Sequence, residues 1–510
     1  MTSQIKRIKI TQQDILFFSL LALVILLRGF VLAGFSFHIF DSDQTIMWNA
    51  AIDYSRGIFH EPRFYGQSYN TMLEALLAVP LIWLSVPVYF ALPLVTSILA
   101  LFPFLLIAFL ARSRGRTMEA CIVLLIPLLL PTEYSFLTSL PRGFVTGIFV
   151  ASLGAVWVYT PLSRKGWFLF GLFGMLGYSV NQNSFLIAAP VMLFLWLENI
   201  RNLRFYLTVG AGILTGLVFH LLALLFYVLH PGYDVHPLPR FMMAIDLFLD
   251  AVMHLDRHLA WVTPLFNSGL MVLFLFAMAG TTLAYQKKRT AALTAFASLA
   301  LILLTLSLKQ MVMSTDSVFY SYARMYLAVP VLLAFLVPFI EIPFRRGYMV
   351  LLVMAFGLCM ARVEDIAPGY DRVLAPGISH IVSVSKLETF RNKCQQVRDY
   401  ARQLNITLVV EDHDYFYDFI NYGCSTCSGN FPATLRPAYE RRTWRLQEEK
   451  STVHENIMII DFSYHLGGEL HQLDGSGVRY FNFQGFYFIL GNKVPTLQLL
   501  KTLSIGIRSF

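Results

Sequence analysis

Two aspartates, Asp41 and Asp43, follow the first hydrophobic segment of the chain, separated from it only by the residues SFHIF. Next to a membrane the local dielectric is low, which raises the pKa of a carboxyl group toward the range useful for proton transfer. Either carboxylate could therefore serve as a general base. The simpler alternative is that one of them caps the helix that the stretch SDQTIMWNAAIDYSRG is expected to form.

The composition of the chain places these carboxylates in a membrane protein. The 510 residues are 56% hydrophobic and only 14% charged, whereas about a quarter of the residues of a soluble domain are charged. Apolar runs of the ~20 residues that a spanning helix needs recur along most of the length. The formal charge of +8 is dispersed at the ends of these runs, which predicts topology signals and no nucleic-acid partner.

The basic residues indicate how the chain crosses the membrane. They form small clusters, which the positive-inside rule assigns to the cytoplasm, and the loops between them are acidic, aromatic or neutral. The pattern predicts about eleven crossings of a bacterial inner membrane, with a cytoplasmic N-terminus and an extracytoplasmic C-terminal part. The clusters are Lys6/Arg7/Lys9, Arg112/Arg114/Arg116, Arg164/Lys165, Arg201/Arg204, Lys287/Lys288/Arg289 and Arg345/Arg346.

One hydrophobic segment is longer than a single crossing needs. Residues 72–111 could form two helices. The loop before them is expected outside and the Arg112 cluster after them in the cytoplasm, however, so the chain must cross an odd number of times between the two. We therefore expect part of residues 72–90, which contain Pro80 and Pro87, to lie along the interface or to enter the membrane only partway. The expected helices lie near residues 15–35, 72–111, 118–131, 143–160, 167–181, 184–198, 205–229, 267–286, 290–308, 324–342 and 347–362.

The character of the chain changes after residue 363. Residues 1–363 form the predicted membrane domain, whereas residues 364–510 are rich in charged and turn residues and are long enough for a soluble domain. In that domain VSKLETFRNKCQQVRDYARQL and DYFYDFINYG read as helices, and ITLVVE and ENIMIIDF as strands. These patterns predict an extracytoplasmic α/β domain.

The cysteines favour a structural disulfide over a metal site. Cys394, Cys424 and Cys427 lie in the extracytoplasmic domain, where one disulfide could persist. Structural zinc needs four ligands, and no second CxxC or paired histidines stand at suitable spacing. The chain also lacks GxxxxGK[ST] and a strand-borne GxGxxG, so a nucleotide is not expected as donor or energy source.

The stretch FYGQSYNTMLEALLAVPL, together with Asp43 after the first helix, resembles the GT-C membrane glycosyltransferases. That family includes bacterial relatives of the protein mannosyltransferases and the aminoarabinose transferase that modifies lipid A. The resemblance covers roughly residues 15–360. It implies an all-α polytopic membrane domain of GT-C type with interfacial helices, followed by the C-terminal α/β domain.

The resemblance also implies an activity. Such enzymes transfer a sugar from a polyprenyl-phosphate donor to a glycan, lipid or protein acceptor of the cell envelope, usually with inversion at the anomeric carbon. It implies that Asp43 acts as, or beside, the general base. The family usually has a second acidic residue where this chain has Gln44, so a second carboxylate comes from Asp41, Glu74 or Glu133, or is absent.

Other residues are expected to bind the substrates. The resemblance implies that Tyr65, Gln67, Tyr69 and Glu74 help to form the donor and acceptor cavity, and it matches Glu133 only by its loop. A sugar hydroxyl needs a carboxylate within hydrogen-bond reach, whereas the lipid-phosphate leaving group needs cations. Arginine suits phosphate best, and the candidates are Arg63, Arg142 and Arg324; the alternative is that each only reaches toward lipid headgroups.

Three further points stay open in the sequence. No metal is expected to be obligatory, although Asp41 and Asp43 could hold a divalent cation through water. A transporter or flippase is a rival function, but its polar groups would gather at the bilayer midplane rather than at one face. A polymerase or ligase of lipid-linked surface polysaccharide is another, for which Arg240, Arg257 and His254 of one large outer loop would be used.

Overall fold

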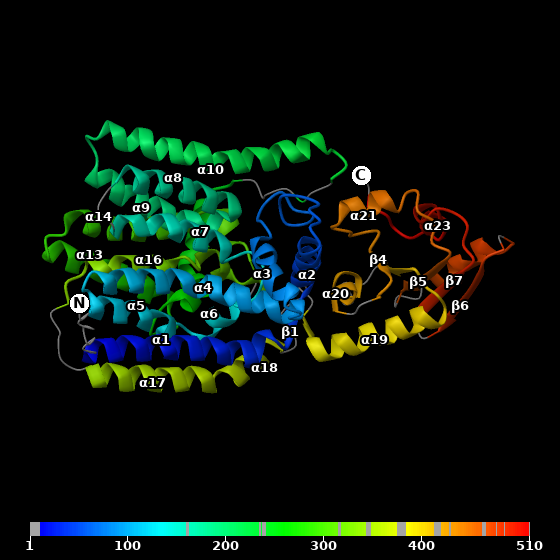
Figure 1. Ribbon diagram of the computed structural model, residues 1–510, viewed down its shortest axis with the longest axis horizontal. Coiled ribbons are helices and arrows are strands. Elements are labelled where there is room, and N and C mark those ends of the chain that lie inside the picture. The colour runs from blue at the N-terminus through cyan, green and yellow to red at the C-terminus, as the bar shows by residue number, and fades with distance from the viewer. Residues whose placement is uncertain are drawn as a thin grey trace, which may run out of the picture.

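The computed structural model has two parts, an elongated helical bundle and a smaller C-terminal α/β part at one end of it (Figure 1). Lys6, Arg7, Lys9, Arg240, Arg345 and Arg346 lie outside the described residues. The described residues are 11–159, 163–233, 236, 241–314, 318–342, 348–374, 384–412, 420–427, 430–461, 466–475, 477–483 and 485–508.

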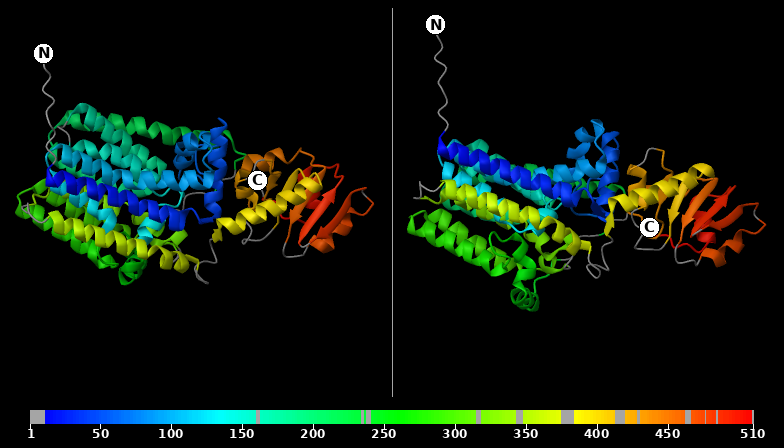
Figure 2. Two further views of the ribbon diagram at one scale, coloured as in Figure 1. Left: turned by 60° about the horizontal axis from the view of Figure 1, so that its bottom comes forward. Right: turned by 90° about the horizontal axis from the view of Figure 1, so that it is seen from below.

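The helices of the bundle run side by side along its long axis (Figures 1 and 2). Among the described residues, four helical segments are long and apolar enough to cross a membrane, which confirms the predicted helical membrane part; the count of crossings stays a prediction. These segments are α1 (Gln12–Val31) with the π-turn η1 (Leu32–Ser36), α4 (Val88–Ser113), α10 (Leu203–Leu229), and Tyr322–Phe339, which contains α16 (Val329–Leu336).

Shorter helices pack against these four. They occur where the hydrophobic periodicity places them, and their facing sides form one continuous apolar core. The shorter helices are α5 (Thr117–Leu129), α7 (Thr146–Ala155), α8 (Arg164–Val180), α9 (Phe185–Glu198), α13 (Gly269–Tyr285), α14 (Arg289–Thr305) and α17 (Tyr348–Glu364).

The long segment 72–111 consists of two helices. α3 (Leu73–Trp83) has 11 residues, about 16 Å of helix, which is too short for a ~30 Å hydrocarbon layer. The break falls immediately before α4, where Pro87 is the N-terminal capping residue, while Pro80 lies within α3. The segment thus supplies one long helix and one short helix at the end of the bundle.

The helix after the aspartates, α2 (Ser42–Ser55), lies deeper than an interfacial position would require. Its residues from Gln44 to Ala51 are buried, and Asn49 donates a hydrogen bond to the carbonyl of Tyr422 in the C-terminal part. A helix that lies only on the membrane surface keeps one face in water. Here the C-terminal part covers that face, which a hydrophobic pattern cannot indicate.

The C-terminal part contains a five-stranded mixed sheet of order β4-β3-β5-β7-β6, which confirms the α/β class. The strands expected from ITLVVE and ENIMIIDF are β3 and β5, and these two pair in parallel. The elements are α19 (Leu387–Gln403), β3 (Leu408–Glu411), β4 (Ala433–Leu435), α21 (Thr443–Glu448), β5 (Asn456–Ile460), β6 (Arg479–Phe483), β7 (Phe486–Leu490) and α23 (Thr496–Thr502).

A short antiparallel strand pair and a disulfide fasten the two parts. β1 (Ile39–Asp41) pairs with β2 (Val384–Lys386), so the strand that ends in Asp41 is hydrogen-bonded to the start of the C-terminal part. Cys394 and Cys424 form the expected disulfide, with Cα atoms 5.2 Å apart. The disulfide joins α19 to the π-turn η9 (Ile420–Cys424), which packs on α2. Most of the helix expected from DYFYDFINYG, and the side chain of Cys427, lie outside the described residues.

Candidate functional site

Arg142 contacts both aspartates that follow the first helix. Its Nη1 lies 3.0 Å from Asp41 Oδ2 and its Nη2 lies 2.6 Å from Asp43 Oδ2. The side chains of Asp41 and Arg142 are 0% and 3% exposed, whereas that of Asp43 is 24% exposed. The three groups form one buried ion cluster, and Asp43 is the carboxylate that opens to a cavity.

Local backbone structure holds this cluster in place. Asp41 is the N-cap of α2 and accepts a hydrogen bond from the Gln44 N–H (3.0 Å), while Asp43 lies in the first turn. Arg142 is presented by a turn in which Gly143 has a φ of +78°, a conformation that side chains other than glycine rarely adopt. The Gly143 N–H donates to Glu74 Oε2 at 3.0 Å.

The pKa values of the two aspartates are shifted in opposite directions. Burial raises the pKa of Asp41 to about 6, and the opposing charge of Arg142 only partly offsets this. Burial also acts on Asp43, but the positive charges of Arg142 and Arg441 outweigh it, so its pKa is lower than usual. Asp43 is therefore ionised at neutral pH and able to accept a hydrogen bond.

Asp43 opens into a cavity of about 130 Å³ between the bundle end and the loops around it. Five of the residues predicted for the site line this cavity: Asp43, Gln67, Tyr69, Arg142 and Arg324. The remaining lining residues are Phe64, Asn70, Phe144, Asn181, Gln182, Gln310 and Met325.

Arg324 supplies a second buried guanidinium to the cavity. It is 6% exposed and donates hydrogen bonds to the carbonyls of Ser321 and Met313, both at 3.3 Å. The guanidinium groups of Arg142 and Arg324 lie 5.6 and 5.9 Å from the ring centre of Phe144. Two cations therefore flank one aromatic ring, which favours an anionic ligand beside them.

The other predicted residues lie around the cavity without lining it. Tyr65 donates a hydrogen bond to Asp53 (3.0 Å) and is fully buried. Arg63 contacts His220 Nδ1 (2.9 Å) and the carbonyl of Ser179. Both belong to the loop between α2 and α3, residues 56–72.

Glu74 and Glu133 do not line the cavity at Asp43, and their surroundings differ. Glu74 is fully buried, and its desolvation raises its pKa to about 8. Glu133 lies in α6 (Thr132–Leu137) and forms an ion pair with Arg372 of α18 (Ile366–Leu374) at 3.0 Å. Among the sequence candidates for a second carboxylate, Asp41 is the one in contact with the same arginine as Asp43.

Several residues at or next to the cavity were not among the predicted site residues. Asn181 caps the turn Gln182–Ser184 and also donates to Asn70 Oδ1 at 2.9 Å. Gln310 comes from the short helix α15 (Lys309–Val312), far along the chain, and carries no motif. Arg441 of the C-terminal part, whose Nη2 lies 3.8 Å from Asp43 Oδ1, belongs to the basic stretch ERRTWR; the sequence gives no sign that this stretch reaches the bundle.

A second, mostly apolar cavity of about 300 Å³ lies beside the first. The two share Gln182, Gln310 and Met325 in their linings, so they are neighbours in space. The other residues that line the second cavity are Tyr178, Asn183, Phe185, Leu186, Phe241, Thr305, Leu308 and Met311. A polar chamber with arginines and a carboxylate thus adjoins an apolar one.

The carboxylates of Asp41 and Asp43 leave little room for a divalent cation between them. Arg142 already contacts one oxygen of each carboxylate. Among the described residues, no group of three or more His, Cys, Asp or Glu side chains is arranged to hold a metal ion. Positive charge at this site comes from guanidinium groups.

Comparison with solved structures shows the fold. The crystal structure of ArnT from Cupriavidus metallidurans in the apo state matches with a TM-score of 0.54 over 92% of this chain and 97% of that one, at 11% identity. The Archaeoglobus fulgidus oligosaccharyltransferase in complex with Zn and sulfate overlaps with 94% of this chain and 73% of that one at 11% identity, with a TM-score of only 0.41. No protein-family model and no characterised protein sequence matches the chain. The resemblance to GT-C membrane glycosyltransferases is thus confirmed at the level of the fold.

Proposed function

We propose that this membrane protein is a glycosyltransferase that transfers a sugar from a polyprenyl-phosphate donor to a glycan, lipid or protein acceptor of the cell envelope. The observation that carries the proposal is the pair of neighbouring cavities. One contains an ionised carboxylate and two buried arginines, and the other is apolar. A donor with a sugar, a phosphate and a long hydrocarbon chain matches a polar cavity with an apolar cavity beside it.

The arginines account for the phosphate of the donor. Arg142, Arg324 and Arg441 all act on Asp43 electrostatically, and these three positive charges exceed the two negative charges of Asp41 and Asp43. A phosphate monoester that leaves with the bonding electrons gains negative charge, and guanidinium groups stabilise it without transferring a proton. The apolar cavity would take the first isoprene units of the chain.

Asp43 is the proposed general base. Its carboxylate would accept the proton of the acceptor hydroxyl while the hydroxyl oxygen attacks the anomeric carbon and the bond from that carbon to the phosphate oxygen breaks. Attack on the face opposite the leaving phosphate inverts the anomeric carbon. Asp41 would act as a positioning residue, because it is buried, caps α2 and orients Arg142.

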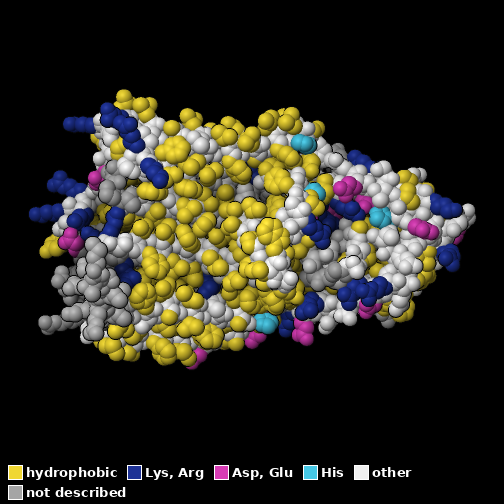
Figure 3. Space-filling model, in the orientation of Figure 1, with side chains coloured by type: hydrophobic (Ala, Val, Ile, Leu, Met, Phe, Trp, Pro, Cys, Tyr) yellow, Lys and Arg dark blue, Asp and Glu magenta, His cyan; other side chains and the backbone are white. Residues whose placement is uncertain are grey.

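The charge distribution supports the proposed orientation. Lys and Arg side chains gather at the end of the bundle that is farthest from the C-terminal part (Figure 3). A broad hydrophobic belt lies between that end and the C-terminal part. We propose an inner-membrane protein with that charged end in the cytoplasm. The basic clusters would require about eleven crossings, of which α7 would make one together with the 3₁₀ turn Val156–Tyr159 that continues it. Residues 1–363 would form the catalytic domain and residues 364–510 an extracytoplasmic domain.

The test is transfer of radiolabelled sugar from a polyprenyl phosphate in membranes that contain the wild-type protein or Asp43→Asn, with matched expression. Asparagine keeps the shape of the side chain and removes the base. We expect the variant to lose about 10²–10⁴-fold in rate. Glu133→Gln is the matched control, because it removes a carboxylate that is paired with Arg372 outside the cavity, and it should transfer sugar like the wild type.

Two outcomes would contradict the proposal. If Asp43→Asn transfers sugar as fast as the wild type, Asp43 is not the base, and Asp41 and Glu74 become the carboxylates to test. If the wild-type protein consumes no labelled polyprenyl donor at all, the transporter and the polymerase or ligase functions become the leading alternatives.

A further inference from the structure

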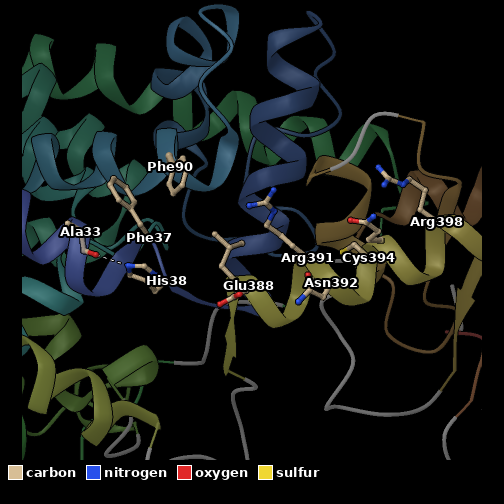
Figure 4. A pocket seen from close by; sticks show the side chains of 11 residues that line it. Ala33, Phe37, His38, Phe90, Glu388, Arg391, Asn392, Cys394 and Arg398 are labelled. Atoms are coloured by element: carbon tan, nitrogen blue, oxygen red, sulfur yellow. Dashed lines mark hydrogen bonds between the residues drawn. The ribbon is translucent and has the colours of Figure 1, made fainter.

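A cavity of about 630 Å³ lies away from Asp43, where the bundle meets the C-terminal part. It shares none of the lining residues of the cavity at Asp43. Figure 4 shows Ala33, Phe37 and Phe90 entering it from the bundle, and Glu388, Arg391, Asn392 and Arg398 entering it from α19. Nothing in the proposed transfer reaction uses this cavity.

The cavity has an apolar end and a charged end. Its apolar residues belong to the ends of two long apolar helices: Ala33 and Phe37 follow α1, and Phe90 lies in the first turn of α4. The charged end is one face of α19, where Arg391 and Arg398 are seven residues apart, or about 10 Å along the helix. The neighbouring face of α19, with Phe390, Val397 and Ala401, is buried in the core, and Cys394, between the two faces, also lines the cavity.

The charges of the lining favour an anion. The lining contains two arginines and one glutamate, Glu388, and Asn392 and Gln395 add uncharged donors. Arg398 also lies 3.9 Å from Asp399, which is not among the lining residues. The Arg391 guanidinium lies 5.7 Å from the ring centre of Tyr89, which orients it at the bundle side of the cavity. Guanidinium groups bind phosphate oxygens through two parallel hydrogen bonds. When the groups are exposed, added salt weakens this electrostatic attraction.

We propose that this cavity binds the phosphate headgroup of an anionic membrane phospholipid. The phosphate would lie between Arg391 and Arg398, and the upper part of the acyl chains would contact Phe37 and Phe90. The volume is in the range of ligand sites that hold a headgroup. The site is distinct from the donor cavity and does not depend on the proposed transfer.

Such a lipid would bind across the seam between the two parts. Leu387 and His38, which both line the cavity, are joined by a hydrogen bond from the Leu387 N–H to the His38 carbonyl at 2.7 Å. His38 immediately precedes the strand that ends in Asp41. Occupancy of the cavity would therefore stabilise the seating of the C-terminal part next to the ion cluster.

The test is titration of the full-length protein, in a zwitterionic detergent, with short-chain phosphatidylglycerol, with bound lipid counted by native mass spectrometry. Arg391→Gln/Arg398→Gln should weaken binding about tenfold or more. Lys393→Gln/Arg402→Gln is the matched control, because it removes the same charge from the same helix outside the cavity, and it should bind like the wild type.

Three results would overturn the proposal: unchanged binding in the arginine variant, an equal loss in the control, or no preference over phosphatidylcholine. Glycerol 3-phosphate serves as the free anion. If it displaces the lipid at equal concentration, the site recognises a soluble phosphate ester and the lipid assignment fails.

A second measurement on the wild-type protein removes the risk that a variant misfolds. Phosphatidylglycerol with a photoreactive group next to the phosphate should label the peptide that contains residues 387–398. Label confined to the hydrophobic belt of the bundle would overturn the proposal as well.

Discussion

At the scale of single residues, the guanidinium of Arg142 contacts Asp41 and Asp43 alike, yet the two carboxylates have different environments. Asp41 is enclosed by protein and caps a helix, whereas Asp43 reaches a cavity and has a second arginine, Arg441, nearby. Burial therefore dominates the pKa of Asp41, and positive charge dominates that of Asp43. The carboxylate with the raised pKa is therefore not the one that opens to the cavity.

The pKa of Asp41 sets the expected pH dependence of transfer. Below about pH 6 Asp41 becomes protonated, and Arg142 loses one of its two anionic partners. We expect kcat/KM to fall as the pH drops through 6 and to be flat above it. For the free energy of unfolding the sign is opposite: because the folded pKa is raised, the contribution of Asp41 to stability is present below its unfolded value and lost as the pH rises through 6.

The assignment of this acid limb can be checked in the Asp41→Asn variant. Asparagine does not titrate, so the limb near pH 6 should disappear from the profile of kcat/KM, whatever residual rate the variant has. A limb that stays near pH 6 in Asp41→Asn would show that another group titrates there.

Glu74 is predicted to be uncharged at neutral pH. Its pKa is about 8 because of burial, so Glu74→Gln replaces a protonated carboxyl by an amide of the same shape and should leave the thermal midpoint nearly unchanged at about pH 4, where the carboxyl is protonated in the unfolded chain as well. Glu74→Ala leaves the Gly143 N–H without its acceptor and should cost about 1–3 kcal/mol.

The same variants give a test at alkaline pH. The wild type loses the contribution of Glu74 to stability as the pH rises from the pKa of the unfolded carboxyl to 8, because the unfolded carboxyl ionises in this range whereas the buried one stays protonated. Glu74→Gln should therefore melt at a higher temperature than the wild type at pH 9 in detergent. Equal melting of the two proteins at both pH values would contradict a raised pKa.

At the scale of elements, the site depends on contacts between segments that are far apart in the chain. The C-terminal part contacts the loop before α3: Trp444 of α21 stacks on His60 with ring centres 4.0 Å apart and meets Tyr65 edge-on at 4.5 Å. Gly66, with a φ of +72°, lies directly against Arg441, where a Cβ would come within 3.0 Å of the Arg441 side chain and carbonyl. This close contact brings Arg441 to Asp43.

Arg441 is accordingly expected to support transfer from outside the bundle. Its side chain is 35% exposed, so solvent weakens its effect, and we expect Arg441→Gln to raise KM for the polyprenyl donor by up to about tenfold with a smaller change in kcat. Arg479→Gln removes the same charge from the exposed strand β6 and is the control. Identical kinetics of the two variants would rule out a role for Arg441 in donor binding.

At the scale of the whole molecule, the arrangement predicts which end is accessible from outside the cell. Lys501 is exposed on α23 in the C-terminal part, and Ser113 is exposed at the far end of α4. In a variant with Cys427→Ser as background, Lys501→Cys should react with an impermeant maleimide in spheroplasts. Ser113→Cys should react only after permeabilisation. Labelling in the reverse order would invert the proposed topology.

The sequence by itself determined the features that depend on local pattern and composition. The membrane class, the helical segments, the strands from ITLVVE and ENIMIIDF, and a disulfide among the C-terminal cysteines follow from hydrophobic periodicity and residue type. Asp43, Arg142 and Arg324 could be singled out because charged residues next to apolar runs are few. These inferences need only neighbours in the chain, and local physics is enough for them.

Only the tertiary structure decided which of the singled-out residues meet. Arg142 joins Asp41 to Asp43 because the turn at Gly143 brings it to the first turn of α2. Asp43, in that first turn, precedes Arg142 by 99 residues in the chain. Tyr65, Arg63 and Glu133 have other partners, while Asn181, Gln310 and Arg441 come to the site without a motif. Such contacts are set by how helices and the C-terminal part pack over long sequence distances, and residue spacing along one chain carries no record of that packing.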